Sequence, residues 1–288
     1  MNFSIIIPTF KNYDYLSLCI ESIFKNSSFN HELIIHLNGH DENSKKLISD
    51  KKLLFTESDE NIGLCSGVNL AAQKATMEYI LYAHDDMYFL PKWDEHLKKE
   101  VELINHNKFY LSLTQLSHTG AIKGSLQHIQ FNCGDTINNF DEKKLLAEYD
   151  KFDFNDLQGS HWAPHLIHKT VWESVNGFSE EFNPGFGSDP DLNMKLWNAG
   201  IRIFKGVSKS RVYHFSSLTA RKNDKIVPND GKKTFLLKWG ITVDFFVKHY
   251  LNRGVVYETP LNDPKKNLIY YLDLLQAKIK YFIVKFIK

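Results

Sequence analysis

The sequence has few cysteines, almost no net charge and no long apolar run. Its three cysteines, Cys19, Cys65 and Cys133, are odd in number and far apart, which suits a reducing compartment better than a disulfide framework. The 35 basic and 34 acidic side chains leave a net charge of +1, which argues against a polycation that holds a nucleic-acid backbone. No stretch approaches the roughly 18 to 20 apolar residues of a membrane-spanning helix. The opening residues also lack the basic region of a signal peptide. We therefore expect a cytoplasmic protein that binds no nucleic acid.

The chain does have enough apolar residues for a sizeable core. Its 288 residues are 43% hydrophobic, which is ordinary for a globular protein and too high for a disordered one. This length suits one large α/β domain or two modest ones.

The first third of the chain alternates strand-like and helix-like patterns. Apolar runs predict strands at 3–8, 32–37, 53–55 and 79–83, and helical spacing of apolar residues predicts helices over 13–23 and 65–75. Such repetition is typical of a parallel sheet covered by helices, in which ligands bind outside the carboxyl ends of the strands. The predicted binding edge therefore includes Pro8, Thr9, Asn38 and the segment 84–86.

The middle of the chain is less regular. Its patterns predict helices over 93–104, 171–175 and 190–199 and strands over 109–116, 201–204 and 211–215, with hairpin and loop material over 117–160. We expect two halves of one α/β domain, 1–110 and 111–220, followed by a helical extension over 221–288.

The C-terminal segment carries an apolar stripe at alternating spacings of four and three. The stripe consists of Leu268, Leu272, Leu275, Ile279, Phe282 and Phe286. Six lysines and one aspartate lie between Lys265 and Lys288. A basic amphipathic helix can lie in the interface of an anionic membrane. The alternative is a helix that packs its stripe on its own domain or on a second subunit of a homo-oligomer.

Two acidic motifs are candidates for chemistry. His84, Asp85 and Asp86 follow a buried strand, where adjacent carboxylates suit a divalent cation on a diphosphate, although a solvated turn has the same composition. In the second motif, Asp189 is expected to cap a helix that begins at Pro190. Capping would lower the pKa of Asp189, and a bound acceptor would raise it. The preceding segment, 183–187, is suited to shaping an acceptor cleft.

Three histidines, His161, His165 and His168, have spacings that suggest zinc only on a helix. Pro164 breaks that helix, so we expect no zinc site there.

Assembled in order, these segments resemble a family 2 glycosyltransferase of the GT-A fold, over roughly residues 3 to 218. The similar segments are 4–10, 32–39, 61–63 with Asn69, 79–86, 177–182, 189–200 and 212–214. The resemblance implies a Rossmann-like, mostly parallel sheet flanked by helices. It also implies a metal-dependent, inverting transfer of a sugar from a nucleotide-sugar donor to a hydroxyl of a carbohydrate or lipid-linked glycan.

The resemblance also implies residue roles. Asp86, with Asp85 and His214, would bind Mn²⁺ or Mg²⁺, and Asp189 would be the general base. The nucleotide pocket would be lined by Pro8, Thr9, Asn38, Asn61, Gly63, Asn69, His84 and Asp85. The acceptor would contact Trp162, Gly187 and Asp191.

Three positions depart from the family pattern. Leu37 stands where an aspartate usually contacts the nucleotide base, His84 stands at the first acidic position of the D-x-D motif, and Ser188 replaces the acidic residue before the catalytic aspartate. Two other functions remain open: a catalytically degenerate module that binds nucleotide-sugar or glycan, and a nucleotidyltransferase, for which the chain lacks a glycine-rich phosphate loop. By analogy, the basic tail suggests a lipid-linked acceptor at the inner face of the cytoplasmic membrane, as in bacterial surface polysaccharides.

Overall fold

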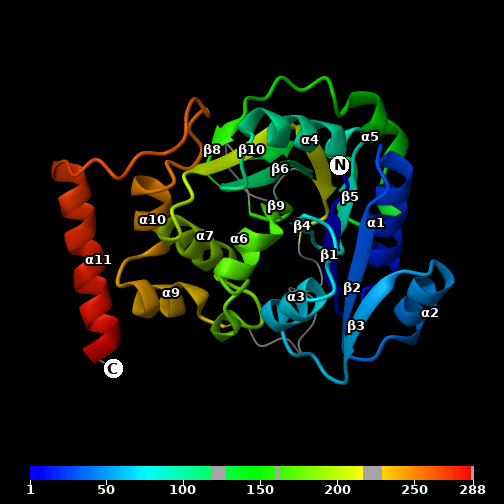
Figure 1. The fold of residues 1–288 in the computed structure, drawn as a ribbon, viewed down its shortest axis with the longest axis horizontal. Helices are drawn as coiled ribbons and strands as arrows, with labels where there is room; N and C mark the ends of the chain where they lie inside the picture. Colours follow the sequence, from blue (N-terminus) through cyan, green and yellow to red (C-terminus); the bar gives the residue numbers. More distant parts are fainter. Residues whose placement is uncertain (119–127, 160–161, 217–228, 287–288) are drawn as a thin grey trace.

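The computed structural model describes residues 1–118, 128–159, 162–216 and 229–286 (Figure 1). His161 of the histidine trio lies outside the described residues. One sheet has helices around it, and further helices follow it at the C-terminal end of the molecule. The predicted α/β fold is confirmed.

The sheet combines parallel and antiparallel strands. Along its main path the strand order is β3-β2-β1-β4-β9-β6-β10-β5, with β7 beside β6 and β8 beside β10. The strands are β1 (Ser4–Thr9), β2 (Glu32–Asn38), β3 (Leu54–Ser58), β4 (Tyr79–Tyr82), β5 (Met87–Phe89), β6 (Phe109–Ser117), β7 (His128–Gln130), β8 (Leu157–Gln158), β9 (His165–His168) and β10 (Ile203–His214). β1 pairs in parallel with β2 and β4, whereas β9 runs antiparallel between β4 and β6.

Helices connect and cover these strands. They are α1 (Tyr13–Asn26), α2 (Glu42–Asp50), α3 (Leu64–Ala72), α4 (Trp93–Ile104), α5 (Glu142–Glu148), α6 (Lys169–Ser174), α7 (Ser188–Asn198), α9 (Gly231–Trp239), α10 (Val243–His249) and α11 (Leu268–Phe286). The apolar run in β1 is continuous because helices cover the sheet, so that side chains on both faces of the strand are apolar. Ile5, Ile6 and Ile7 are fully buried. α3 contacts β1 and β2, and α4 contacts β10.

β10 corrects the prediction of two separate strands over 201–204 and 211–215. It is one strand with a register shift between Val207 and Arg211, where β10 bulges against β6. The bulge interrupts the alternation of side chains, so the sequence pattern reads as two pieces. Residues 117–160 also contain a helix, α5, in addition to the expected loops.

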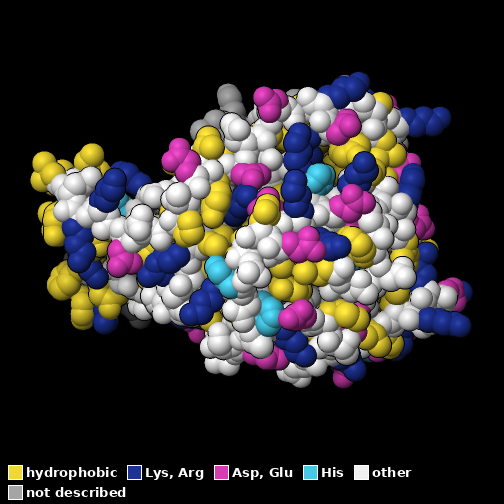
Figure 2. Space-filling model, turned by 45° about the horizontal axis from the view of Figure 1, so that its top comes forward, with side chains coloured by type: hydrophobic (Ala, Val, Ile, Leu, Met, Phe, Trp, Pro, Cys, Tyr) yellow, Lys and Arg dark blue, Asp and Glu magenta, His cyan; other side chains and the backbone are white. Residues whose placement is uncertain are grey.

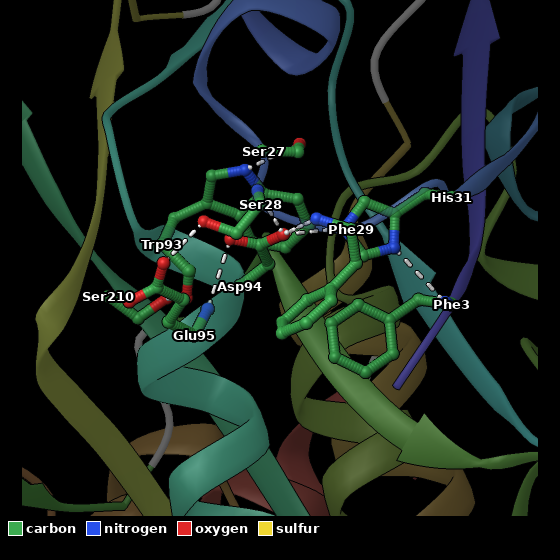
Figure 3. A network of polar contacts seen from close by, with 9 residues as sticks. All are labelled: Phe3, Ser27, Ser28, Phe29, His31, Trp93, Asp94, Glu95 and Ser210. Atoms are coloured by element: carbon green, nitrogen blue, oxygen red, sulfur yellow. Dashed lines mark hydrogen bonds and ion pairs between the residues drawn. The ribbon is translucent and has the colours of Figure 1, made fainter.

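A polar network outside the binding edge joins the loop after α1 to the first turn of α4 (Figure 3). The Asp94 carboxylate accepts hydrogen bonds from the backbone amides of Ser28 and Phe29 and contacts His31 Nε2 at 3.1 Å. Burial alone would raise the pKa of Asp94, but these hydrogen bonds lower it below its usual value. His31 in turn accepts a hydrogen bond from the amide of Phe3 in the segment before β1. This buried acid is fully engaged in holding the fold.

The C-terminal helices α9, α10 and α11 lie beyond the sheet, with α11 at the far end of the molecule (Figure 1). α9 and α10 contact α7, and α11 contacts α9 and α10. Gly231 at the start of α9 touches the loop before α7, because a Cβ on Gly231 would lie 1.9 Å from the carbonyl oxygen of Phe186. No helix among the described residues is long and apolar enough to cross a bilayer.

Candidate active site

A cavity of about 320 Å³ lies at the predicted binding edge of the sheet. One wall consists of Pro8, near the end of β1, and of Tyr82 and the segment 84–86, at and after the end of β4. The opposite wall is the loop 184–187 that leads into α7. The lining residues are Pro8, Leu64, Tyr82, His84, Asp85, Asp86, Pro184, Gly185, Phe186, Gly187, Ser188 and Asp189. The two acidic motifs, separate in the sequence, therefore face one space.

Three possible metal ligands converge beside this cavity. One donor atom from each of His84, Asp86 and His214 lies within 4.8 Å of the other two. His214 Nε2 is 3.2 Å from Asp86 Oδ1, and His84 Nδ1 is 4.0 Å from the same oxygen. The pairing of β5 with β10 creates this group, because it sets His214 opposite Met87, directly after Asp86. Burial lowers the pKa of His84 to about 4, so its imidazole is neutral and retains a lone pair at physiological pH.

The orientation of His214 is set by its second nitrogen. Nδ1 lies 2.9 Å from Gln115 Oε1, an acceptor, so Nδ1 carries the proton and donates it. The side-chain amide of Gln115 is itself oriented, since it donates to the carbonyl oxygen of Ala163. The Nε2 atom of His214 is buried without a hydrogen-bond partner among the described residues, and its lone pair faces Asp86. A buried unpaired acceptor beside a carboxylate fits a bound cation, and a hydrogen bond to the far nitrogen is the usual support of a histidine ligand.

The charges around the cavity also fit a cation. Asp85, Asp86 and Asp189 line it, and no lysine or arginine occurs among the described lining residues. Burial and the neighbouring Asp86 raise the pKa of Asp85, against a hydrogen bond that Thr9 Oγ1 donates to Asp85 Oδ2 at 2.7 Å. Among the described lining residues no positive side chain would offset the charge of a diphosphate, and carboxylates in such a setting suit a divalent ion.

The structure corrects the predicted environment of Asp189. α7 begins at Ser188 with Gly187 as its N-cap, so Asp189 lies in the first turn and caps nothing. A positive φ of 88° at Gly187 allows this helix start. Within the part of the chain that the structure describes, Asp189 Oδ1 is buried without a hydrogen-bond partner. Burial raises the pKa of Asp189 to about 7, and the charge of Arg253 opposes this increase. The expected lowering by a capping position is therefore wrong, and the pKa is already raised without an acceptor.

Three of the expected nucleotide-binding residues build one turn. Asn38 Oδ1, at the end of β2, accepts a hydrogen bond from the amide of Ile62 at 2.7 Å. Asn61 Oδ1 accepts one from the amide of Gly63 at 2.9 Å. Gly63 has a φ of 87°, and a Cβ there would lie 2.3 Å from Asn183 Oδ1. These side chains hold the turn before α3, which supports the cavity wall at Leu64.

Two other expected site residues are engaged elsewhere. Asn69 exchanges two hydrogen bonds of 2.9 Å with the backbone of Phe178. Asp191 is fully buried, accepts a hydrogen bond from Trp239 Nε1 at 2.8 Å and lies 2.9 Å from Lys238 Nζ. Neither residue lines the cavity. Asn69 therefore joins α3 to the segment before α7, and Asp191 joins α7 to α9.

Trp162, the third expected acceptor contact, stacks against Arg253, a residue of the C-terminal extension. The guanidinium of Arg253 lies 4.3 Å from the centre of the Trp162 ring. Burial lowers the pKa of Arg253 to about 10, and the charge of Asp189 opposes that decrease. Arg253 and Gln115 were not predictable from the sequence, since no motif surrounds either one and each reaches the site only through tertiary contacts.

The chain has a family match and several structural neighbours. Residues 4–161, more than half of the chain, match the family model described as Glycosyl transferase family 2. No curated protein matches the chain. The crystal structure of S. aureus TarS 1-349 has a TM-score of 0.59 at 12% identity, covering 99% of this chain and 73% of that one. The same fragment with UDP-GlcNAc has a TM-score of 0.57 at 13% identity, covering 99% and 81%.

GalNAc-T7, solved with UDP, GalNAc and Mn²⁺, has a TM-score of 0.59 at 13% identity, and the match covers 99% of this chain and 56% of that one. The chain spans 44% of the longer TarS structure. At these identities the structural neighbours establish the GT-A fold, and the family match establishes the class of enzyme. The chain belongs to glycosyl transferase family 2 and is a glycosyltransferase of the GT-A fold.

Proposed function

We propose that the enzyme transfers a sugar, with inversion, from a nucleotide-sugar donor to a hydroxyl of a carbohydrate or a lipid-linked glycan. The observation that carries the proposal is that Asp86 and Asp189, from distant segments, line one cavity, with His214 next to Asp86. An inverting transfer needs a base on the acceptor hydroxyl and charge stabilisation on the leaving diphosphate. These two groups of side chains supply both requirements.

In this proposal Asp189 is the general base. A carboxylate with a pKa near 7 suits the task, because it is partly ionised at neutral pH and still accepts a proton readily. Its Oδ1 atom is buried and has no hydrogen-bond partner among the described residues, so no side chain of the described fold competes for the proton that it would accept. General base catalysis by a positioned side chain typically contributes about 10²- to 10⁴-fold.

His84, Asp86 and His214 would hold the divalent ion, Mn²⁺ or Mg²⁺, with Asp85 beside them. When bound, the ion supplies a Lewis acid for the negative charge that develops on the diphosphate. Gln115 fixes the tautomer of His214, and Thr9 orients the Asp85 carboxylate. In support, the GalNAc-T7 structure contains Mn²⁺ with UDP.

We further propose that residues 1–110 bind the donor, that residues 111–220 bind the acceptor, and that residues 221–288 form an extension that supports the acceptor side. The neighbours TarS and GalNAc-T7 were solved with UDP, which makes uridine nucleotides the first donors to test. The proposed setting is bacterial cell-envelope polysaccharide synthesis at the inner face of the cytoplasmic membrane. Trp162 and Gly187 are the proposed acceptor contacts.

The test is a product assay with Mn²⁺, a panel of UDP-sugars and glycan acceptors. We expect acceptor-dependent release of nucleoside diphosphate, and a glycoside of inverted anomeric configuration by NMR. Asp189→Asn should remove turnover and leave Mn²⁺-dependent UDP binding intact, whereas Glu181→Gln, an acid outside the cavity, should leave turnover unchanged. Release of pyrophosphate would instead identify a nucleotidyltransferase. Binding of donor without turnover for the whole panel would identify a binding module.

A further inference from the structure

Helix α11 presents its apolar stripe to solvent. Nine of the eighteen large apolar side chains that are exposed among the described residues belong to this one helix. They are Leu268, Ile269, Tyr271, Leu272, Leu275, Ile279, Phe282, Ile283 and Phe286. Figure 2 shows hydrophobic side chains gathered at this end of the molecule, with lysines among them. An apolar patch of this extent marks an interaction surface.

The opposite face of α11 is the one that packs on the protein. Tyr270 and Ala277 are its buried residues, and with 3.6 residues per turn both lie opposite the stripe. The Tyr270 ring is 5.1 Å from the Phe245 ring, centre to centre. The only acidic residue of the helix, Asp273, is paired on this side with Lys248 at 2.6 Å and with His249 at 2.7 Å. The helix is therefore held by one face, and its stripe points away from the fold.

The charged side chains around the stripe are all lysines. Helical geometry sets Lys280 on one border of the stripe and Lys278 and Lys285 on the other. Lys265 and Lys266 precede the helix. Lysines beside an apolar face extend their charged ends toward a polar boundary while their stems cover apolar surface. No unpaired carboxylate faces this side among the described residues of α11.

We propose that α11 lies in the plane of an anionic lipid membrane, with its stripe among the acyl chains and its lysines at the headgroups. An interfacial helix combines an apolar face with basic borders, as this one does, and needs no spanning length. The helix has 19 residues, so it extends for about 28 Å along the surface. The surface it fits carries negative charge and is apolar beneath, which is the chemistry of a bilayer rich in acidic phospholipids.

A second copy of the chain fits this surface less well. A two-fold dimer sets the same patch against itself. Two copies of this face would bring lysine borders together with no acidic side chains to compensate them, and like charges in close apposition are destabilising. Charge therefore favours the lipid surface over self-association.

The test uses the full chain, without donor or acceptor, and sedimentation with vesicles. We expect binding to vesicles that contain 30% phosphatidylglycerol, weak binding to pure phosphatidylcholine, and loss of binding in high salt. Ile279→Glu, within the stripe, should lower the partition coefficient about tenfold or more. Leu103→Glu, at another exposed apolar residue, on α4, is the control and should leave partitioning unchanged.

A fluorescent probe gives an independent measurement of insertion. The three native cysteines are buried, so Leu275→Cys can be labelled selectively with an environment-sensitive dye. We expect a blue shift and protection from an aqueous quencher with anionic vesicles only. The same dye on Leu103→Cys should show neither effect.

Three results would overturn the proposal. They are failure to bind anionic vesicles, equal loss of binding by Ile279→Glu and Leu103→Glu, and a stable dimer by light scattering that Ile279→Glu converts to monomer. Because these measurements require no turnover, they are independent of the proposed reaction. The vesicle assay and the product assay therefore fail separately: an active enzyme that does not bind vesicles contradicts only the membrane proposal, and a vesicle-binding chain without turnover contradicts only the proposed reaction.

Discussion

His214 Nε2 lies 3.2 Å from Asp86 Oδ1 while its Nδ1 donates to Gln115 Oε1. One imidazole thus joins the candidate metal ligands to a side chain on the neighbouring strand, since His214 lies on β10 and Gln115 on β6. The histidine is held in one tautomer by a residue that does not line the cavity. In the proposed metal site, Gln115 is therefore a positioning residue.

Replacing Asp86 is expected to remove the metal site. Asp86→Asn takes away the only carboxylate of the three converging ligands, so Mn²⁺ affinity should fall more than tenfold. Titration of free Mn²⁺ by electron paramagnetic resonance measures this directly. Asp153→Asn, an exposed acid, is the control. Unchanged Mn²⁺ binding in the Asp86 variant would refute the assignment.

His84 is expected to determine which ion the site prefers. Two imidazoles and one carboxylate favour Mn²⁺ over Mg²⁺, because Mg²⁺ is the harder of the two ions and imidazole nitrogen is a poorer ligand for it. His84→Asp should therefore raise the affinity for Mg²⁺ relative to Mn²⁺, as measured by calorimetry with each metal. An unaltered ratio of the two affinities would show that His84 does not bind the ion.

Replacing Gln115 tests the positioning role. Gln115→Leu removes the acceptor that holds the proton on His214 Nδ1, so Mn²⁺ affinity should fall about 10- to 100-fold with the three ligands still present. Gln115→Glu retains an acceptor and should recover most of the affinity. A matched change on an exposed strand residue, Gln130→Leu, should have no effect. Equal metal binding by Gln115→Leu and the native chain would contradict the role.

Ionisation of Asp189 is expected to lower the free energy of unfolding. Its pKa is raised by burial from 3.8 to about 7, so the stability present below about pH 4 is progressively lost as the pH rises toward 7. Asp189→Asn carries no charge at any pH, so it should be more stable than the native chain at pH 8 by about 2–4 kcal/mol. At pH 4 the two should be alike. Urea unfolding at both pH values measures the difference, and equal stability at pH 8 would exclude a buried, ionising Asp189.

Arg253 is expected to influence the pH at which turnover rises, because that pH follows the pKa of Asp189. Its positive charge opposes the increase in the pKa of Asp189. Arg253→Gln should therefore raise that pKa, and the midpoint of the rise in turnover with pH should move upward from about 7. Arg202→Gln removes an arginine that lies over Trp197, away from Asp189, and is the control. If the midpoint stays in place while turnover falls, Arg253 acts by some route other than charge.

Much of the fold follows from local pattern. The helix over 93–104 and the strands at the start of the chain were predictable because their apolar spacing is regular and their ends carry turn residues. α2 was missed because only Ser44 and Ile48 of its residues are buried, which leaves almost no periodic signal. β5 and β9 were missed because they are only three and four residues long. Tertiary pairing, more than propensity, defines such short strands.

The candidate site was predictable only where motifs mark it. The segment 84–86 and Asp189 were identified from their acidic motifs and His214 from the family resemblance, and the structure brings them together. The environment of Asp189 was not predictable, since a capping aspartate and a buried first-turn aspartate have the same local sequence. Gln115 reaches His214 across 99 residues, and such long-range partners leave no mark in sequence spacing.

The contact between Gly187 and Gly231 has a practical consequence for work with this enzyme. A Cβ on Gly187 would lie 2.9 Å from the carbonyl oxygen of Gly231, so the loop that leads to Asp189 rests directly on the first turn of α9. Shortening the gene to the family-matched segment, 4–161, would delete Asp189 itself, and a chain that ended before α9 would lose that support together with the buried Phe235 and Leu236. Expression trials should therefore keep everything through α10 and reserve deletions for the last helix.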